Sequence, residues 1–223
     1  MFKLSISASS IYSGIKSTKY FAGSSFHDNL FSFMFLVRCS YTIYTKKISL
    51  NEEYDITFTS AIDNLKAGDF SKAHKQFDTA LKLYLANKGE LDENVAYLYV
   101  QKGVAAFKNK QIQEAEKCFS EAERSIKSLT DVDPNLISYL YTNMETLFSS
   151  GKDIDRAIYY AKQALDMQNK VPNNDKENFV NINLRIAELL HAKARNYQDS
   201  LPYYQACETE IANGTKVDPS NLC

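Results

Sequence analysis

A small–aromatic–small pattern recurs along this chain at a spacing of 42 or 43 residues. It is clearest in residues 108–126, KNKQIQEAEKCFSEAERSI, where it takes the form A-x3-F-x2-A. Self-similarity at a fixed period indicates stacked structural repeats, because one short unit cannot bury its apolar face alone. The four triplets are Ala73, Phe77 and Ala80; Ala115, Phe119 and Ala122; Ala157, Ala161 and Ala164; and Ser200, Tyr204 and Cys207.

Each repeat is predicted to contain two antiparallel helices, because an apolar-periodic segment such as VAYLYVQKGVAAFK precedes every triplet. Short breaks separate the two helices at 67–69, 109–111, 150–153 and 195–198. Polar loops with helix-capping residues divide the pairs at 87–94, 130–135 and 170–178. The sequence therefore predicts an all-α fold with about four antiparallel helix pairs, eight helices across 54–211, and no sheet.

The triplets have a packing role in this prediction. Two helices approach closely only where side chains are small, so the first alanine is expected at each helix crossing. The ring one turn later fills the wedge between repeats, and the second small residue lets the next repeat dock. The residues assigned to repeat packing are Ala73, Phe77, Ala80, Tyr99, Gly103, Ala115, Phe119, Ala122, Tyr141, Ala157, Ala164 and Tyr204.

This arrangement resembles the tetratricopeptide repeat (TPR) family over about 55–211. In the second repeat Tyr99 stands where the family has Trp, and Gly103 where it has Gly. In the third repeat Tyr141, Met144 and Phe148 occupy first-helix positions. The resemblance implies a TPR-like superhelical stack and a non-enzymatic adaptor or scaffold that mediates protein–protein interaction.

The repeats depart from the family in two respects. Glu145 and Glu188 stand where a small residue is usual. The common period is 34 residues, so the longer period here resembles the branch typified by kinesin light chains, whose D-x-x-x-A element has counterparts in DENVA (92–96) and DPNLI (133–137). Long repeats also occur in mitochondrial assembly factors, including one that maintains respiratory complex III.

The first 50 residues differ from the rest in charge and composition. They hold six basic residues and one acidic residue, a net of +5, whereas the remaining 20 basic and 26 acidic residues give −6. A basic, acid-poor and Ser/Thr-rich segment is typical of a mitochondrial transit peptide, and VRCSYT around Arg38 resembles a processing site. One alternative is a disordered or partly packed extension; another is a membrane or secretory segment, although the apolar run LFSFMFLV has only eight residues.

These observations divide the chain into three parts. Residues 1–50 form a poorly packed N-terminal segment, 51–212 the TPR domain, and 213–223 a C-terminal tail. The predicted location is mitochondrial if the first segment is a transit peptide, and cytoplasmic if it is a flexible tail. Membrane association is expected only indirectly, through a partner.

Residues typical of catalysis or metal binding show no pattern that predicts a site. The sequence lacks GxSxG, P-loop and dinucleotide-binding motifs. Its histidines have no His or Cys at metal-ligand spacing: His74 is expected to be solvated, and His191 to pack in the fourth repeat. Cys118 and Cys207 are expected to be small packing residues with free thiols. We therefore predict no enzyme, no metal and no cofactor.

Two kinds of partner are disfavoured. A net charge near −1 and the lack of a basic stripe argue against nucleic acid. Some TPR domains bind chaperone C-termini through a carboxylate clamp of Lys and Arg on successive first helices. Here Phe58 and Ile62 take the expected clamp positions, and the third repeat's first helix, NLISYLYTNMETLF, has no basic residue. A chaperone carboxylate clamp is therefore not expected.

First helices line the concave groove of TPR stacks, and here that line is apolar and aromatic. The residues predicted to contact a protein partner are Phe58, Ile62, Tyr97, Val100, Val104 and Tyr139. The alternative is that they only pack between repeats or under the N-terminal segment. Three functional hypotheses remain: a scaffold for assembly or maintenance of a mitochondrial respiratory-chain complex, a cytosolic peptide- or cargo-binding adaptor, or a permanent subunit of a large complex.

Overall fold

The computed structural model describes residues 26–88, 92–171, 175–194 and 197–217. Helix is the regular structure found in these ranges. The chain divides into two units, Met1–Ser49 and Leu50–Cys223. Helix α2 (Phe26–Ala67) begins in the first unit and ends in the second.

The described part of the first unit is the beginning of α2, and it was not predicted to be helical. We expected the first helix to start near residue 54, but α2 already begins at Phe26. No glycine or proline lies between Phe26 and Ala67, so nothing in this stretch interrupts a helix. Residues 1–25 of the predicted targeting segment lie outside the described residues. No described helix is both long and apolar enough to cross a membrane.

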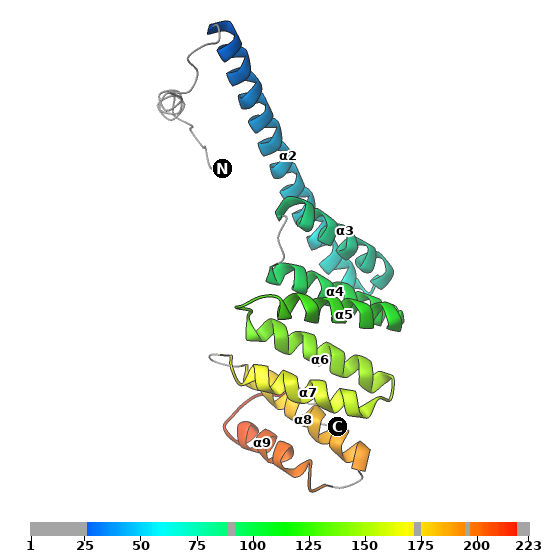
Figure 1. Cartoon of the computed structure of the whole chain (residues 1–223). Coiled ribbons are helices and arrows are strands. Elements are labelled where there is room, and N and C mark those ends of the chain that lie inside the picture. Colours follow the sequence, from blue (N-terminus) through cyan, green and yellow to red (C-terminus); the bar gives the residue numbers. More distant parts are fainter. Residues whose placement is uncertain (1–25, 89–91, 172–174, 195–196, 218–223) are drawn as a thin grey trace. The chain divides into compact units, whose positions relative to one another are not determined.

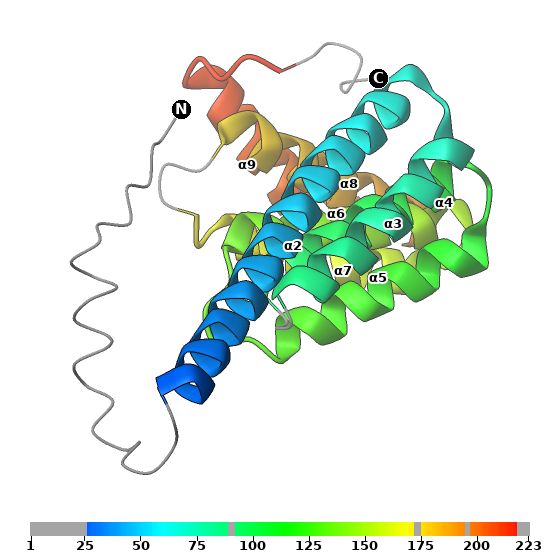
Figure 2. The same ribbon diagram turned by 90° about the horizontal axis from the view of Figure 1, so that it is seen from above.

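The second unit contains the predicted helix pairs, and the all-α prediction is confirmed. The end of α2 pairs with α3 through contacts such as the Asn64–Gln76 hydrogen bond. The other pairs are α4–α5, α6–α7 and α8–α9, with helices following one another in chain order (Figure 1). Seen from above, α8 and α9 lie to one side of α4 and α5 (Figure 2). The bounds are α3 (Phe70–Lys88), α4 (Glu93–Lys108), α5 (Ile112–Lys127), α6 (Pro134–Ser150), α7 (Ile154–Gln168), α8 (Lys176–Ala194) and α9 (Leu201–Ala212).

The turn inside each of the first three pairs has the same backbone geometry. Gly68, Lys110 and Lys152, spaced by 42 residues, have φ of 83°, 62° and 62°. After each, the next backbone N–H donates to a carbonyl five residues earlier, the first of these bonds running from Asp69 to Asn64 at 2.9 Å. A left-handed residue followed by this bond is the Schellman ending, which satisfies the last carbonyls of a helix. These three hairpins therefore turn in the same way at a spacing of 42 residues.

Aspartate caps begin most of the following helices. Asp92 accepts hydrogen bonds from the backbone of Asn94 and Val95 at the start of α4. Asp133 caps α6 directly before Pro134, and Asp153 caps α7. These residues lie in the predicted loops and breaks, where a side-chain oxygen replaces the missing helical acceptor.

The triplets lie in the interior. Each of the first three is almost fully inaccessible to solvent, and in the fourth Ser200 and Cys207 are buried while Tyr204 is half-buried. At the α4–α5 crossing a Cβ atom added to Gly103 would lie 2.5 Å from Cε1 of Phe119. Glycine therefore lets the buried ring approach the α4 backbone.

The two glutamates that depart from the family are placed differently from each other. Glu145 occupies the position equivalent to Gly103, 42 residues on, and is buried in α6. Its opposite residue is Ala161 rather than a phenylalanine, which leaves room for the longer side chain. In the fourth repeat the equivalent residue is Ala187, which is buried, so the assignment of Glu188 to the small position was wrong.

Candidate partner-binding face

The first helices α4, α6 and α8 carry side chains at matched positions. Positions 97, 139 and 181 hold Tyr, Tyr and Asn, and positions 101, 143 and 185 hold Gln, Asn and Arg. Within each helix the two positions are four residues apart and so lie on one side. We call this set the first-helix face: Tyr97, Gln101, Tyr139, Asn143, Asn181 and Arg185.

Tyr139 is the most accessible aromatic residue of the first-helix face, with 39% of its surface exposed. Burial of its hydroxyl is the main cause that raises its pKa, followed by the nearby Tyr97. Hydrogen bonding to the side chains of Gln101 and Asn143 acts in the opposite direction. Tyr139 is thus held between two first helices with part of its ring open to solvent.

The other predicted groove residues are less accessible than expected. Val100 is completely buried in the core between repeats, so its assignment as a partner contact was wrong. Phe58, Ile62 and Val104 are half-buried and pack against the core clusters. Helix α4 contributes residues to both core clusters, so it packs against neighbours on more than one side. Apolar periodicity alone therefore could not distinguish core residues from groove residues on this helix.

Tyr97 is half-buried because α2 supplies an aromatic neighbour. Its ring centroid lies 6.2 Å from that of Phe58, and Phe58 also contacts Tyr54 and Phe77. Such separations are typical of favourable aromatic pairs. The aromatic line predicted along the groove is therefore partly a packing cluster in the first repeat, and the accessible section lies on α6 and α8.

The α6–α8 section contains a small cavity of about 60 Å³. The charged pair Arg185 and Glu145 borders it, with Arg185 Nη2 donating to Glu145 Oε1 at 2.7 Å. The same guanidinium also donates to Ser149 Oγ at 3.3 Å and, through Nη1, to Glu188 Oε2 at 2.9 Å. Burial alone would lower the pKa of Arg185, but the hydrogen bonds and charges of the two glutamates together outweigh it and raise the pKa. The cavity is lined by Thr142, Glu145, Ala161, Ala164, Asn178, Asn181, Ile182 and Arg185.

The polar members of the first-helix face were not predicted. Gln101, Asn143 and Arg185 are spaced by 42 residues, as are Tyr97, Tyr139 and Asn181. Extending the repeat period to polar positions would have found them, whereas the search for apolar anchors passed over them. Gln101 is buried, so the accessible part of the face combines the aromatic surface of Tyr139 with the polar groups on Asn143, Asn181 and Arg185.

His74 and His191, neither of which was predicted to bind a ligand, differ in their surroundings. His74 was predicted to be solvated, but its side chain is only 18% exposed and lies beside Glu114 and Cys118 of the next repeat. This prediction was wrong because α3 packs on the second repeat through the side that carries His74. His191 is half-buried and its ring lies 4.3 Å from that of Tyr197.

The repeated hairpins define a TPR-like helical-repeat protein. In comparisons with known proteins, neither a family model nor a curated protein matches the sequence.

A solved structure does share the fold. The crystal structure of BtubC (BKLC) from P. vanneervenii, a kinesin light chain-like protein, is similar with a TM-score of 0.65 and 19% sequence identity. The similarity covers 74% of this chain and 66% of that chain. At this identity the likeness concerns the fold alone.

Proposed function

We propose that this protein is a non-enzymatic scaffold that holds an extended segment of a protein partner against the first helices α6 and α8. The observation that carries this proposal is the exposed ring of Tyr139 beside the matched polar positions of the first-helix face. A segment that crosses both helices would meet Tyr139 and Asn143 on α6 and the matched pair Asn181 and Arg185 on α8.

The side chains on this face suit such a ligand. Tyrosine provides a large contact area with one polar end at low entropic cost, so it is a favoured anchor in interfaces. Asn143 lies one helical turn after Tyr139 and uses Nδ2 to donate to the Tyr139 carbonyl, which leaves its side-chain oxygen to accept from a bound segment. The guanidinium of Arg185 on α8 is 43% exposed and adds a positive charge to the face. In recognition of extended peptides, backbone hydrogen bonds supply affinity and side-chain contacts supply specificity.

Site-specific photo-crosslinking tests the face directly. A photoreactive residue at Asn143 is compared with one at Ser120, which is exposed on the second helix α5. We expect a discrete crosslinked partner from position 143 and none from position 120. Equal crosslinking from both positions would contradict the assignment of the face.

We further propose that this scaffold acts in assembly or maintenance of a mitochondrial protein complex. The net charge of +5 and the Ser/Thr-rich composition of the first 50 residues support this location. Cell fractionation with N-terminal sequencing of the endogenous protein is the test. A mature form in mitochondria that begins after the basic segment is expected, and an intact Met1 in the cytosolic fraction would favour a cytosolic cargo adaptor instead.

A further inference from the structure

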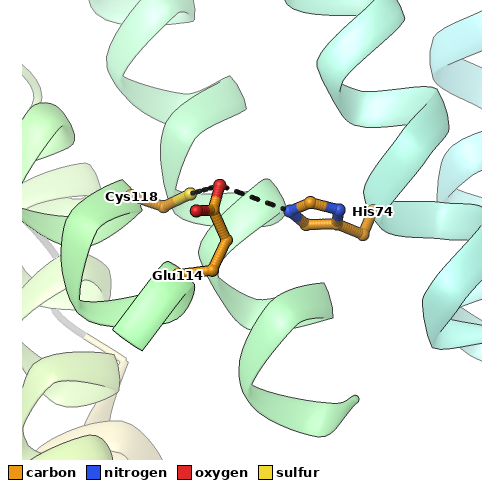
Figure 3. Close-up of side chains that lie close together, drawn as sticks. All are labelled: His74, Glu114 and Cys118. Atoms are coloured by element: carbon orange, nitrogen blue, oxygen red, sulfur yellow. Dashed lines mark hydrogen bonds and ion pairs between the residues drawn. The ribbon is translucent and has the colours of Figure 1, made fainter. Parts of the chain in front are cut away.

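Three side chains that can bind metal ions converge where the first repeat meets the second (Figure 3). Glu114 Oε1 lies 3.7 Å from His74 Nε2 and 3.7 Å from Cys118 Sγ. All three ligand atoms lie within 4.8 Å of one another. They come from α3 and α5, so the cluster joins two repeats.

The local sequence explains the convergence. Glu114 and Cys118 are four residues apart on α5 and therefore lie on the same side of that helix. His74 follows Ala73, the small residue at the α2–α3 crossing, and extends toward α5 (Figure 3). Repeat stacking thus brings together residues that are 40 or more positions apart in sequence.

The imidazole nitrogen in this cluster lacks a hydrogen-bond partner. His74 Nε2 is buried, and its 3.7 Å separation from Glu114 is too long for a hydrogen bond. Leaving a buried polar atom unpaired is unfavourable. A metal ion between the three side chains would provide the missing partner.

We propose that His74, Glu114 and Cys118 form a binding site for a divalent transition-metal ion of the zinc class. Zn²⁺ is bound by Cys sulfur at about 2.3 Å, His nitrogen at about 2.0–2.1 Å and carboxylate oxygen at about 2.0–2.2 Å. Tetrahedral geometry then places ligand atoms roughly 3.3–3.6 Å apart. The two separations that involve Glu114 Oε1 already lie near that range. Rotation of the side chains can shorten the third, between His74 Nε2 and Cys118 Sγ.

The ligand set argues for this class of ion. A thiolate with an imidazole suits zinc, whereas calcium and magnesium prefer oxygen ligands throughout. Three protein ligands leave the fourth coordination position to water or to a side chain of a partner. The ion would connect α3 to α5 and so hold the first repeat against the second.

Neighbouring charges are compatible with the ion. Lys102 lies 3.5 Å from Glu114 Oε1, but it also donates to Asp78 Oδ1 at 2.7 Å. Lys102 therefore keeps a carboxylate partner when the metal takes Glu114. Burial lowers the pKa of His74, with Lys102 as the next cause, while Glu114 and Asp78 act in the opposite direction. The net lowering favours the neutral imidazole, which is the form that binds a metal ion.

Binding must release one proton. Burial raises the pKa of the Cys118 thiol to about 12, so the thiol is protonated before the metal arrives. Formation of the metal–sulfur bond transfers that proton to solvent, and the bound Zn²⁺ is balanced by the thiolate and the Glu114 carboxylate. Zinc affinity should consequently increase with pH.

Metal titration of the chelator-treated full-length chain tests the site. Zn²⁺ is added in competition with a chromophoric chelator, and Co²⁺ is added separately to record thiolate-to-cobalt absorption. We expect one equivalent to bind, with the thiolate absorption and a higher Tm. Cys118→Ser should reduce Zn²⁺ affinity by about 100-fold or more, because loss of even an outer partner costs 10–100-fold.

Cys207→Ser is the matched control, since Cys207 is also buried and its Sγ lies 3.4 Å from the Val180 carbonyl oxygen. It should leave affinity and the cobalt spectrum unchanged. His74→Gln and Glu114→Gln provide further tests if Cys118→Ser unfolds, as judged by circular dichroism. Failure of the wild-type chain to bind one equivalent, or binding that persists in Cys118→Ser or His74→Gln, would overturn the proposal.

Discussion

Arg185 Nη2 lies 2.7 Å from Glu145 Oε1 and so links α8 of the fourth repeat to α6 of the third. The two side chains differ in accessibility, 43% for Arg185 and 3% for Glu145. The arginine therefore brings a solvent-exposed charge to a carboxylate that has almost no contact with water. This pairing makes a glutamate tolerable at a position where the repeat otherwise has a small residue.

Arg185→Met should destabilise the protein more than the double variant Glu145→Ala/Arg185→Met. Removing one partner of a fully buried pair costs about 3–5 kcal/mol, and the partial exposure of Arg185 reduces our expectation to about 2 kcal/mol. Urea unfolding of the two variants and the wild type gives the comparison. A single variant as stable as the double variant would show that Glu145 does not depend on Arg185.

Gly103→Ala should lower the free energy of unfolding by about 1–3 kcal/mol, the usual cost of overpacking. The added Cβ would overlap the ring of Phe119, which is enclosed by the core and has little freedom to move. Thermal denaturation measures the effect. Gly151→Ala is the control, because its Cβ would meet the nearest atom at 3.5 Å, an ordinary contact. Equal Tm values for both variants would exclude a close crossing at Gly103.

Gly68→Ala should cost about 1 kcal/mol through backbone strain. Its φ of 83° is unfavourable for any residue with a Cβ, although the nearest atom, Cζ of Phe70, is 4.0 Å away. The converse change, Lys110→Gly, should be neutral or slightly stabilising, because Lys110 already has a positive φ. Chemical denaturation of both variants tests whether the two turns are equivalent.

Tyr84→Phe should change the alkaline stability of the protein. Tyr84 donates to Asp92 Oδ2 at 2.5 Å, and burial, with this hydrogen bond, raises its pKa from 10.0 to about 12. Between these values the folded state retains a proton that the unfolded state loses, so stability falls as pH rises. The stability advantage of the wild type over Tyr84→Phe should be full below pH 10 and disappear towards pH 12. An advantage independent of pH would contradict the raised pKa of Tyr84.

Changing both Tyr97 and Tyr139 to serine should weaken partner binding by about 2–4 kcal/mol, as expected for two anchor truncations. Binding of the crosslinked partner is measured by calorimetry, with Tm measured in parallel. Tyr159→Ser is the control, since Tyr159 is exposed on the second helix α7. Tyr139 should account for most of the loss, because Tyr97 is partly covered by Phe58. Unchanged affinity would remove both residues from the proposed interface.

Much of the repeat architecture was predictable because its signals are local. The triplets, capping aspartates and breaks each act within one or two helical turns, and they recur at the same spacing. The beginning of α2 was misplaced, because the composition of its first half suggested a targeting segment. A helix, however, needs no more than an uninterrupted run of compatible residues.

The accessible part of the candidate face was not predictable in the same way. Val100 and Tyr139 both satisfy the apolar period of a first helix, but Val100 is enclosed by its neighbours and Tyr139 is partly exposed. The difference depends on how closely adjacent repeats approach, which is set by the sizes of side chains on several helices. No single helix contains that information.

The sequence by itself determined the repeat period, the helix pairs and the residues of each crossing, because these depend on short-range periodicity and on side-chain size. Only the tertiary structure decided which equivalent positions remain accessible, how Glu145 acquires Arg185, and that His74 meets Glu114 and Cys118. These relationships join residues about 40 positions apart, and stacking brings them within a few ångströms only when the helices cross at the observed distances.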